Sequence, residues 1–219
     1  MQLTIGGAGG APPRRSLASD ARRGQIITAA IEVLAEHGYA QSTFARIKRK
    51  AGISSTRLIS YHFGTKDELM DAVLADAAGS MQAAIAERTR SEKTAAGMLD
   101  ARIEAELEWI AGHLSAVRAM YEVCMNARSE DGTLRFGVEA TAQANVGQLE
   151  PILRAGQRSG EFRAFDTVLM ALTLKAAVDA AIARMTCPPR LSLAECVREL
   201  TTLARLATRR GPDADRDRR

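Results

Sequence analysis

Residues 54–62 (SSTRLISYH) place hydroxyls, an arginine, a phenol and an imidazole within one short segment. If this segment is helical, Arg57, Ser60 and Tyr61 share one face, because residues three and four apart are neighbours on a helix. A guanidinium, a hydroxyl and a phenol can all donate hydrogen bonds to phosphate oxygens and to base edges in a DNA groove. The segment therefore favours a DNA-reading helix, which we expect over residues 55–62.

A preceding helix and a tight turn would hold this segment in place. Thr43 is a good N-cap residue, and Phe44, Ile47 and Ala51 follow it at helical spacing. Gly52 can adopt the positive φ angle that a tight turn requires. We therefore expect a short helix after Thr43 that ends at Gly52.

Residues on either side of the two short helices also indicate where helices start and end. Gly64 is expected to end the reading helix, and Thr65 with Glu68 has the spacing of a capping box that starts another helix. Upstream, a helix over residues 20–37 carries an apolar stripe that would pack on the two short helices, and Gly38 can end it. Two short helices around a glycine turn, followed by a capped third, are the arrangement of a helix-turn-helix DNA reader.

This pattern resembles the TetR family of transcriptional regulators. The residues that carry the resemblance are Thr43, Ile47, Ala51–Ser54, Tyr61–Phe63 and Lys66–Leu69. The resemblance covers residues 20–74. The segment 53–63 is one residue longer than the family's commonest form, Arg57 stands near the usual place of a glycine, and positions 59 and 60 hold no aromatic residue. The individual base contacts therefore have a one-residue ambiguity.

A set of polar and basic residues is expected to contact double-stranded DNA. Phosphate contacts are expected from Thr43, Tyr61, His62 and Lys66, and base contacts from Ser55, Arg57 and Ser60. The full set is Arg22, Arg23, Thr43, Arg46, Ser54, Ser55, Thr56, Arg57, Ser60, Tyr61, His62 and Lys66. Residues 1–70 hold ten Lys and Arg against five Asp and Glu, whereas residues 71–207 hold fifteen against eighteen. The basic excess thus coincides with the expected reader, as electrostatic DNA binding requires, although part of any run of charges is ordinary solvated surface.

The rest of the chain is expected to be helical. Alanine is abundant and aromatic residues are scarce, which favours an all-α protein. The expected helices cover residues 66–90, 91–112, 115–127, 133–158, 166–185 and 192–207, with a kink or break at Pro151 and another break at residues 187–189. The resulting domains are a disordered arm (1–18), a three-helix DNA-binding domain (19–65), a helical ligand-binding and dimerisation domain (66–207) and a disordered tail (208–219). The alternative for the arm is a cloning or start-site artefact without function.

The resemblance implies a ligand cavity among the middle helices and a homodimer. Candidate cavity residues are Trp109, His113, Met120, Tyr121, Cys124 and Met125, whose apolar surfaces and few polar groups suit a partly hydrophobic effector. Ordinary core packing is the alternative for each of them. The homodimer is expected through helices 166–185 and 192–207, where alanines allow close approach; burial of both helices within a monomer is the alternative.

Enzymatic sites are not indicated. Glu104 and Glu108 lie one helical turn apart but resemble solvated carboxylates, and Cys124 lies too far from His113 on a continuous helix to pair with it. We find no phosphate-binding loop, zinc-protease motif or nucleophile elbow. We expect no catalytic residues, no metal site and no cofactor, and we read the three widely spaced cysteines as apolar fillers or, less simply, as redox sensors.

The sequence therefore predicts a ligand-responsive transcriptional regulator that binds a pseudo-palindromic operator as a homodimer. A repressor released by a small molecule is the first interpretation, and an activator of the same fold is its variant. The alternative is a helical small-molecule-binding or scaffold protein with a vestigial DNA reader. The absence of a long apolar run or signal-peptide core in the sequence favours a cytoplasmic protein with no membrane association.

Overall fold

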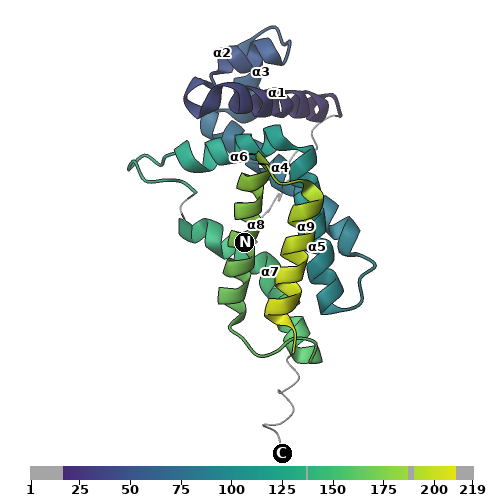
Figure 1. The fold of residues 1–219 in the computed structure, drawn as a ribbon. Coiled ribbons are helices and arrows are strands. Elements are labelled where there is room, and N and C mark those ends of the chain that lie inside the picture. Colours follow the sequence, from purple (N-terminus) through teal and green to yellow (C-terminus); the bar gives the residue numbers. More distant parts are fainter. Residues whose placement is uncertain (1–16, 137, 187–189, 211–219) are drawn as a thin grey trace, which may run out of the picture.

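The computed structural model describes residues 17–136, 138–186 and 190–210, and these form nine α-helices (Figure 1). The helices are α1 (Leu17–Gln41), α2 (Phe44–Lys50), α3 (Thr56–Phe63), α4 (Lys66–Thr89), α5 (Ala95–Gly112), α6 (Leu114–Asn126), α7 (Val138–Ser159), α8 (Thr167–Thr186) and α9 (Leu193–Thr208). Within the described ranges the only extended pairings are two isolated bridges, which confirms the all-α prediction. The expected arm up to residue 16, the break at 187–189 and the tail from 211 lie outside the described residues.

Helices α1, α2 and α3 form one end of the molecule (Figure 1). Their apolar faces meet in one core that contains Leu34, Ile47, Ile59 and Phe63, each almost completely buried. Ile59 and Phe63 thus point into this core. Because these two side chains hold one side of α3, the other side of that helix is presented outward.

Side-chain caps and glycines set the boundaries of these short helices. Gly52 (φ 64°) makes the turn and Gly64 (φ 65°) ends α3. The hydroxyl that begins each helix accepts a backbone N–H two or three residues later, in the pairs Thr43–Arg46, Ser55–Arg57 and Thr65–Glu68. Since Ser55 is the cap, α3 starts at residue 56, one position after the expected start.

The first helix is interrupted where the sequence predicted its end. Gly38 has φ 76° and ψ 171°, after which the chain makes one more helical turn to Gln41. The Tyr39 N–H exposed by this break donates to Glu122 Oε2 of α6 at 2.9 Å, and the Ser42 hydroxyl donates to the Gly38 carbonyl at 2.8 Å. A Cβ at Gly38 would lie 3.2 Å from Glu122 Oε2, so both conformation and space favour glycine here.

Helix α4 belongs to two cores. Leu69, Met70 and Val73 in its first half pack in the core of α1–α3. Ala77, with Met81 packed against it, lies in a second cluster together with Trp109 and Ile110 of α5. The helix is continuous between the two, as the prediction of a single helix over residues 66–90 required.

The remaining helices form a larger apolar core from α5, α7, α8 and α9, which includes Leu107, Leu153, Leu174 and Cys196. Helices α5 and α6 are separated by a break at His113 (φ −131°, ψ 42°), two residues before the expected helix start at Ser115. The His113 ring stacks on Trp109 with 4.6 Å between centroids. This contact stabilises the break, because it turns the imidazole back over α5.

One expectation for the segment before α8 is wrong. The helix expected from residue 133 begins only at Val138, because the preceding residues fold back as a turn with Arg128 bridged to Leu134. Asp131 Oδ1 accepts both the backbone N–H and the hydroxyl of Thr133, which closes that turn. Arg135 then pairs with Asp71 of α4 at 2.8 Å, which fixes the segment against α4.

Helix α7 continues through Pro151 to Ser159, so of the kink or break expected at this proline the break does not occur. Proline removes one N–H donor and costs the helix one hydrogen bond. Leu149 and Leu153 on either side are almost completely buried in the core, and their packing holds the helix together across the proline.

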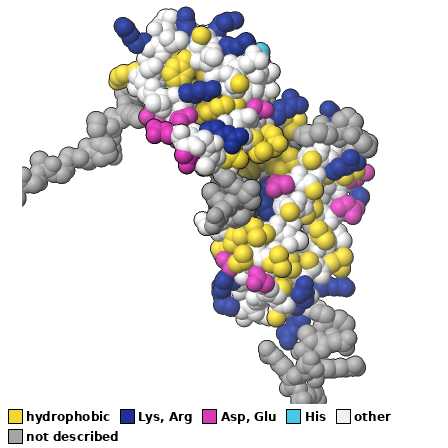
Figure 2. All heavy atoms as spheres, turned by 90° about the vertical axis from the view of Figure 1, so that its left-hand side faces the viewer, with side chains coloured by type: hydrophobic (Ala, Val, Ile, Leu, Met, Phe, Trp, Pro, Cys, Tyr) yellow, Lys and Arg dark blue, Asp and Glu magenta, His cyan; other side chains and the backbone are white. Residues whose placement is uncertain are grey.

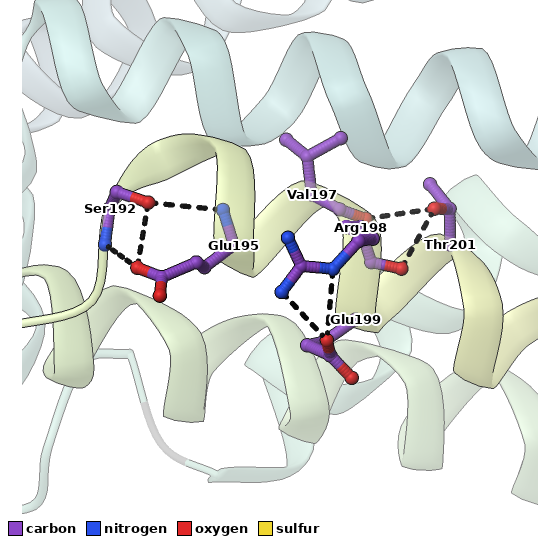
Figure 3. Close-up of polar contacts among 6 residues, drawn as sticks. All are labelled: Ser192, Glu195, Val197, Arg198, Glu199 and Thr201. Atoms are coloured by element: carbon purple, nitrogen blue, oxygen red, sulfur yellow. Dashed lines mark hydrogen bonds and ion pairs between the residues drawn. The ribbon is translucent and has the colours of Figure 1, made fainter.

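Helix α9 begins next to the expected start at residue 192, and Ser192 is its N-cap (Figure 3). The Ser192 hydroxyl accepts from the Glu195 N–H at 3.2 Å while the Glu195 carboxylate accepts from the Ser192 N–H at 2.8 Å. This reciprocal capping box defines where the last helix starts. Further along, the Thr201 hydroxyl donates to the Val197 carbonyl at 2.8 Å, so a buried polar group is satisfied within the helix.

Close packing at Gly156 gives a test of the core. A Cβ there would lie 2.6 Å from Cγ of the buried Phe162, so we expect Gly156→Ala to lower the free energy of unfolding by about 1–3 kcal/mol. Gly147→Ala on the same helix is the matched control, because nothing lies within 4 Å of its added Cβ. Urea denaturation followed by circular dichroism would measure both, and equal stability of the two variants would contradict this packing.

Candidate DNA-binding surface and effector sites

The outward face of α3 gathers the residues predicted to read DNA. Arg57, Ser60 and Tyr61 are exposed, and 80% of the Tyr61 surface is accessible. Ser54 is also exposed just before the helix, and Ser55 is exposed at its cap. Lys and Arg side chains gather over the end of the molecule that α1, α2 and α3 form (Figure 2). The arrangement provides donors for base edges on a helix that is supported from behind by a rigid core.

Arg23 and His62 meet at the C-terminal end of α3. Arg23 Nη1 donates to the His62 carbonyl at 3.2 Å, and its guanidinium lies 4.2 Å from the centre of the Phe63 ring. A cation at this position complements the negative end of the helix dipole. Arg23 therefore orients the reading helix, whereas the neighbouring Arg22 bonds Gln25 on the exposed side of α1 at 2.6 Å.

Lys66 is partly withdrawn from solvent. Its Nζ donates to the Tyr39 carbonyl at 2.9 Å and lies 4.1 Å from the centre of the Tyr39 ring. Burial lowers the pKa of Lys66 below its ordinary value. The ammonium thus ties the end of α1 to the start of α4, next to the expected phosphate contacts. Arg46, another expected DNA contact, donates to Gln41 at 3.1 Å.

Two residues that hold the DNA-binding helices in position were not predicted from the sequence. Gln25 Nε2 donates to the Ala51 carbonyl at 2.6 Å and so closes the end of α2 from α1. Glu122 reaches Tyr39 from α6, 83 positions away along the chain. No local pattern marks either residue, because each acts on a backbone group of a distant segment.

A hollow of about 520 Å³ lies where α1, α4 and the α5–α6 break meet. Trp109 and His113 line it, together with Ile31 of α1 and Ser80 of α4. The Trp109 indole N–H donates to the Ser80 hydroxyl at 3.1 Å. Two of the six predicted effector residues thus lie at the junction between the reader and the rest of the molecule.

The other four predicted effector residues lie along α6, away from this hollow. Met120 packs against the cluster of Trp109 and Ile110. Cys124 is half-buried, and burial raises the pKa of its thiol. Tyr121 and Met125 are exposed on the outer face of the helix. The structure therefore does not gather the six residues around one cavity.

Apolar side chains are exposed on α8 and α9. Leu169 is 65% exposed, Val168 is also exposed, and the small residues Ala176 and Ala180 continue the α8 surface. On α9, Leu203 and Leu206 are exposed, whereas Ala204 is buried. The two helices that were predicted to form the dimer interface therefore expose apolar surface in the single chain.

Comparison with known proteins decides the family. Residues 26–73 match the model of the bacterial regulatory proteins of the tetR family. Residues 26–73 form a TetR-family DNA-binding domain. The match covers α2, α3 and parts of α1 and α4, which are the elements of the reader described above. The chain is therefore a DNA-binding transcriptional regulator.

Individual relatives agree with this family. The chain is 29% identical over 140 residues to the Fatty acid metabolism regulator protein of Bacillus subtilis, covering 64% of this chain and 70% of that protein. It is 37% identical over 67 residues to the HTH-type transcriptional regulator BetI 1 of Chromohalobacter salexigens, covering 31% of this chain and 33% of that one. The second match thus spans about a third of each protein.

Solved structures share the fold over most of its length. The fatty acid degradation regulator FadR from Bacillus halodurans superposes with a TM-score of 0.72 at 19% identity, covering 88% of this chain and 96% of that one. A TetR-like transcriptional regulator from Rhodococcus sp. RHA1 gives a TM-score of 0.67 at 20% identity, covering 87% and 96%. The helical domain behind the TetR reader therefore has the same fold as these regulators.

The described residues hold no group of His, Cys, Asp and Glu side chains arranged to bind a metal ion. Among the same residues, no helix combines the length and apolar character needed to cross a bilayer.

Base reading by α3 can be tested at Arg57. We expect Arg57→Ala to reduce the preference for the operator over unrelated DNA by about 1–3 kcal/mol, because the pair expected between its guanidinium and a base edge would be lost. Arg90→Ala is the matched control, since Arg90 caps the far end of α4 and pairs with Glu87. Competition gel shifts would measure both variants, and an unchanged preference in Arg57→Ala would rule out this contact.

Proposed function

We propose that this TetR-family chain is a transcriptional repressor that a small molecule releases from its operator. The observation that carries the proposal is the exposed face of Arg57, Ser60 and Tyr61 on a helix whose opposite side is locked by Ile59 and Phe63. Such a face fits a major groove, with its donors at base edges and the surrounding cations at phosphates.

Operator binding would require two readers. The apolar surface of α8 and α9 supports a homodimer in which these helices pack against their mates across a two-fold axis. Two α3 helices would then enter successive major grooves of a pseudo-palindrome. The spacing of the two readers would depend on α4, since this helix joins the reader core to the helices behind it (the effector domain, α5–α9).

Release would follow from a change in that spacing. A small molecule that binds better to a conformer with altered α4 would favour a dimer that does not match the operator. The relatives named for fatty acid metabolism and degradation support an effector with an apolar body as the first class to screen.

The first experiment is a gel-shift titration against the DNA upstream of the protein's own gene, with unrelated DNA as competitor. We expect specific binding that weakens by about a thousandfold between 50 and 200 mM salt, as about six neutralised phosphates would give. Equal affinity for the competitor would instead favour a helical ligand-binding protein with an inactive reader.

The dimer can be tested at Leu169. Leu169→Asp places a charge on the proposed interface of both subunits, and the loss of about 1.5–3 kcal/mol per leucine should raise the dimer dissociation constant by about 10²–10⁴-fold. Tyr121→Ser, on the exposed face of α6, is the control and should leave the dimer intact. Sedimentation velocity would measure both, and an unaffected dimer in Leu169→Asp would place the interface elsewhere.

A further inference from the structure

Two charged side chains are buried inside the effector domain. Arg102 is 6% exposed and Glu106 is 4% exposed. Among the described residues, no other charged residue is buried as deeply. They lie one turn apart on α5, which packs against α4, α7, α8 and α9. Burial of a charge is costly unless its hydrogen-bonding groups are satisfied.

The guanidinium of Arg102 is only partly satisfied. Its Nη2 donates to Gln148 Oε1 of α7 at 2.6 Å, whereas Glu106 lies at 3.8 Å, beyond hydrogen-bonding distance. Its Nε is buried and has no hydrogen-bond partner among the described residues. Glu106 is instead closer to Lys175 of α8, at 3.3 Å. The Nε and Nη2 groups form one edge of the guanidinium, which is the edge that takes a carboxylate as a bidentate pair.

The partner of Arg102 also holds α4. Gln148 Oε1 accepts a second hydrogen bond, from Gln82 Nε2, at 2.9 Å. Gln82 lies on α4, the helix that continues into the reader core. One amide oxygen therefore links the buried guanidinium to the helix that positions the DNA-reading domain.

An apolar cluster lies further along α5, toward the reader. Trp109 lies seven residues after Arg102 on the same face of α5, about 10 Å along the helix at about 1.5 Å per residue. Around Trp109 pack Met81 of α4, Met120 of α6 and Ile182 of α8. Methionines adapt readily to the shape of an apolar ligand.

We propose that Arg102 binds the carboxylate of an effector that has an apolar body, and that the carboxylate displaces Gln148 from Nη2. The apolar body lies toward Trp109 and Met120. Once the hydrogen bond from Arg102 is lost, the amide of Gln148 can move. Its hydrogen bond with Gln82 then weakens, and α4 is no longer held to α7 through this contact. This inference rests on the proposed function, since it names the class of effector and the contact through which it acts.

Ligand binding can be measured on the full-length protein without DNA. Trp109 is the only tryptophan, so its fluorescence reports on the site. We would titrate hexanoate, decanoate and hexadecanoate below their micelle concentrations, with 1-hexanol and 1-decanol as uncharged partners. We expect a carboxylate to bind about tenfold or more tightly than the alcohol of equal length. Equal binding of acid and alcohol, no binding of any carboxylate, or tighter binding of decyl phosphate than of decanoate would overturn the proposal.

Two substitutions should move the affinity in opposite directions. Arg102→Lys keeps the charge but removes the bidentate edge, and should weaken carboxylate binding about tenfold or more. Gln148→Leu frees Nη2 and should strengthen binding severalfold, an outcome that a purely structural role of the network would not produce. Arg154→Lys, on the exposed side of α7, is the control and should change nothing. Unchanged or weaker binding by Gln148→Leu would overturn the competition between carboxylate and amide.

The coupling between the ligand site and the DNA-binding domain is measured by how far saturating ligand releases the upstream DNA fragment from the protein. Gln82→Leu should bind the carboxylate as well as the wild type does, yet show a smaller release of DNA at saturation, because the link to α4 is already absent. Release equal to that of the wild type would overturn the role of Gln82. Specific DNA binding without ligand tests the proposed function separately, so failure of the reader and failure of the carboxylate site give different results.

Discussion

One apolar core, shared between the reader and the helices behind it, constrains the rest of the molecule. The side chains of α1, α2 and α3 are not sufficient to close this core. Its remaining members come from the first half of α4 and from Ala119, Val123 and Ala127 at α6. The DNA-reading end is therefore not an independent unit, because any change in its orientation must alter packing against α6 as well as along α4. Close-packed cores of this kind switch between discrete arrangements more readily than they deform continuously.

Local signals in the sequence predicted much of the reader. Hydroxyl caps and glycines act within three or four residues, so Thr43, Gly52 and Thr65 could be assigned from sequence alone and were found in those roles. The contacts that orient the reader could not be predicted in this way. Glu122 binds Tyr39, and Arg135 binds Asp71, across 64 to 83 positions, and each contact requires the fold to exist first. The same reason explains why α7 continues through Pro151, where burial of the flanking leucines outweighs the local preference of proline.

The basic residues near the reader fall into two groups, those exposed on its surface and those bonded to helix ends. The composition of the sequence could not distinguish the two groups. Arg57 is exposed on α3, but Arg23 and Lys66 donate to the carbonyls of His62 and Tyr39. Backbone carbonyls left without partners at helix ends attract such donors. A basic excess in a reader domain is therefore partly a property of its helix ends.

The continuity of α4 has a consequence for how the protein can diverge. Each residue added to a helix turns everything beyond it by about 100° and shifts it by about 1.5 Å. An insertion or deletion between Val73 and Ala77 would rotate one core of α4 out of register with the other. Side chains along this stretch can be exchanged one at a time, but its length cannot, and homologous chains should show substitutions there without gaps.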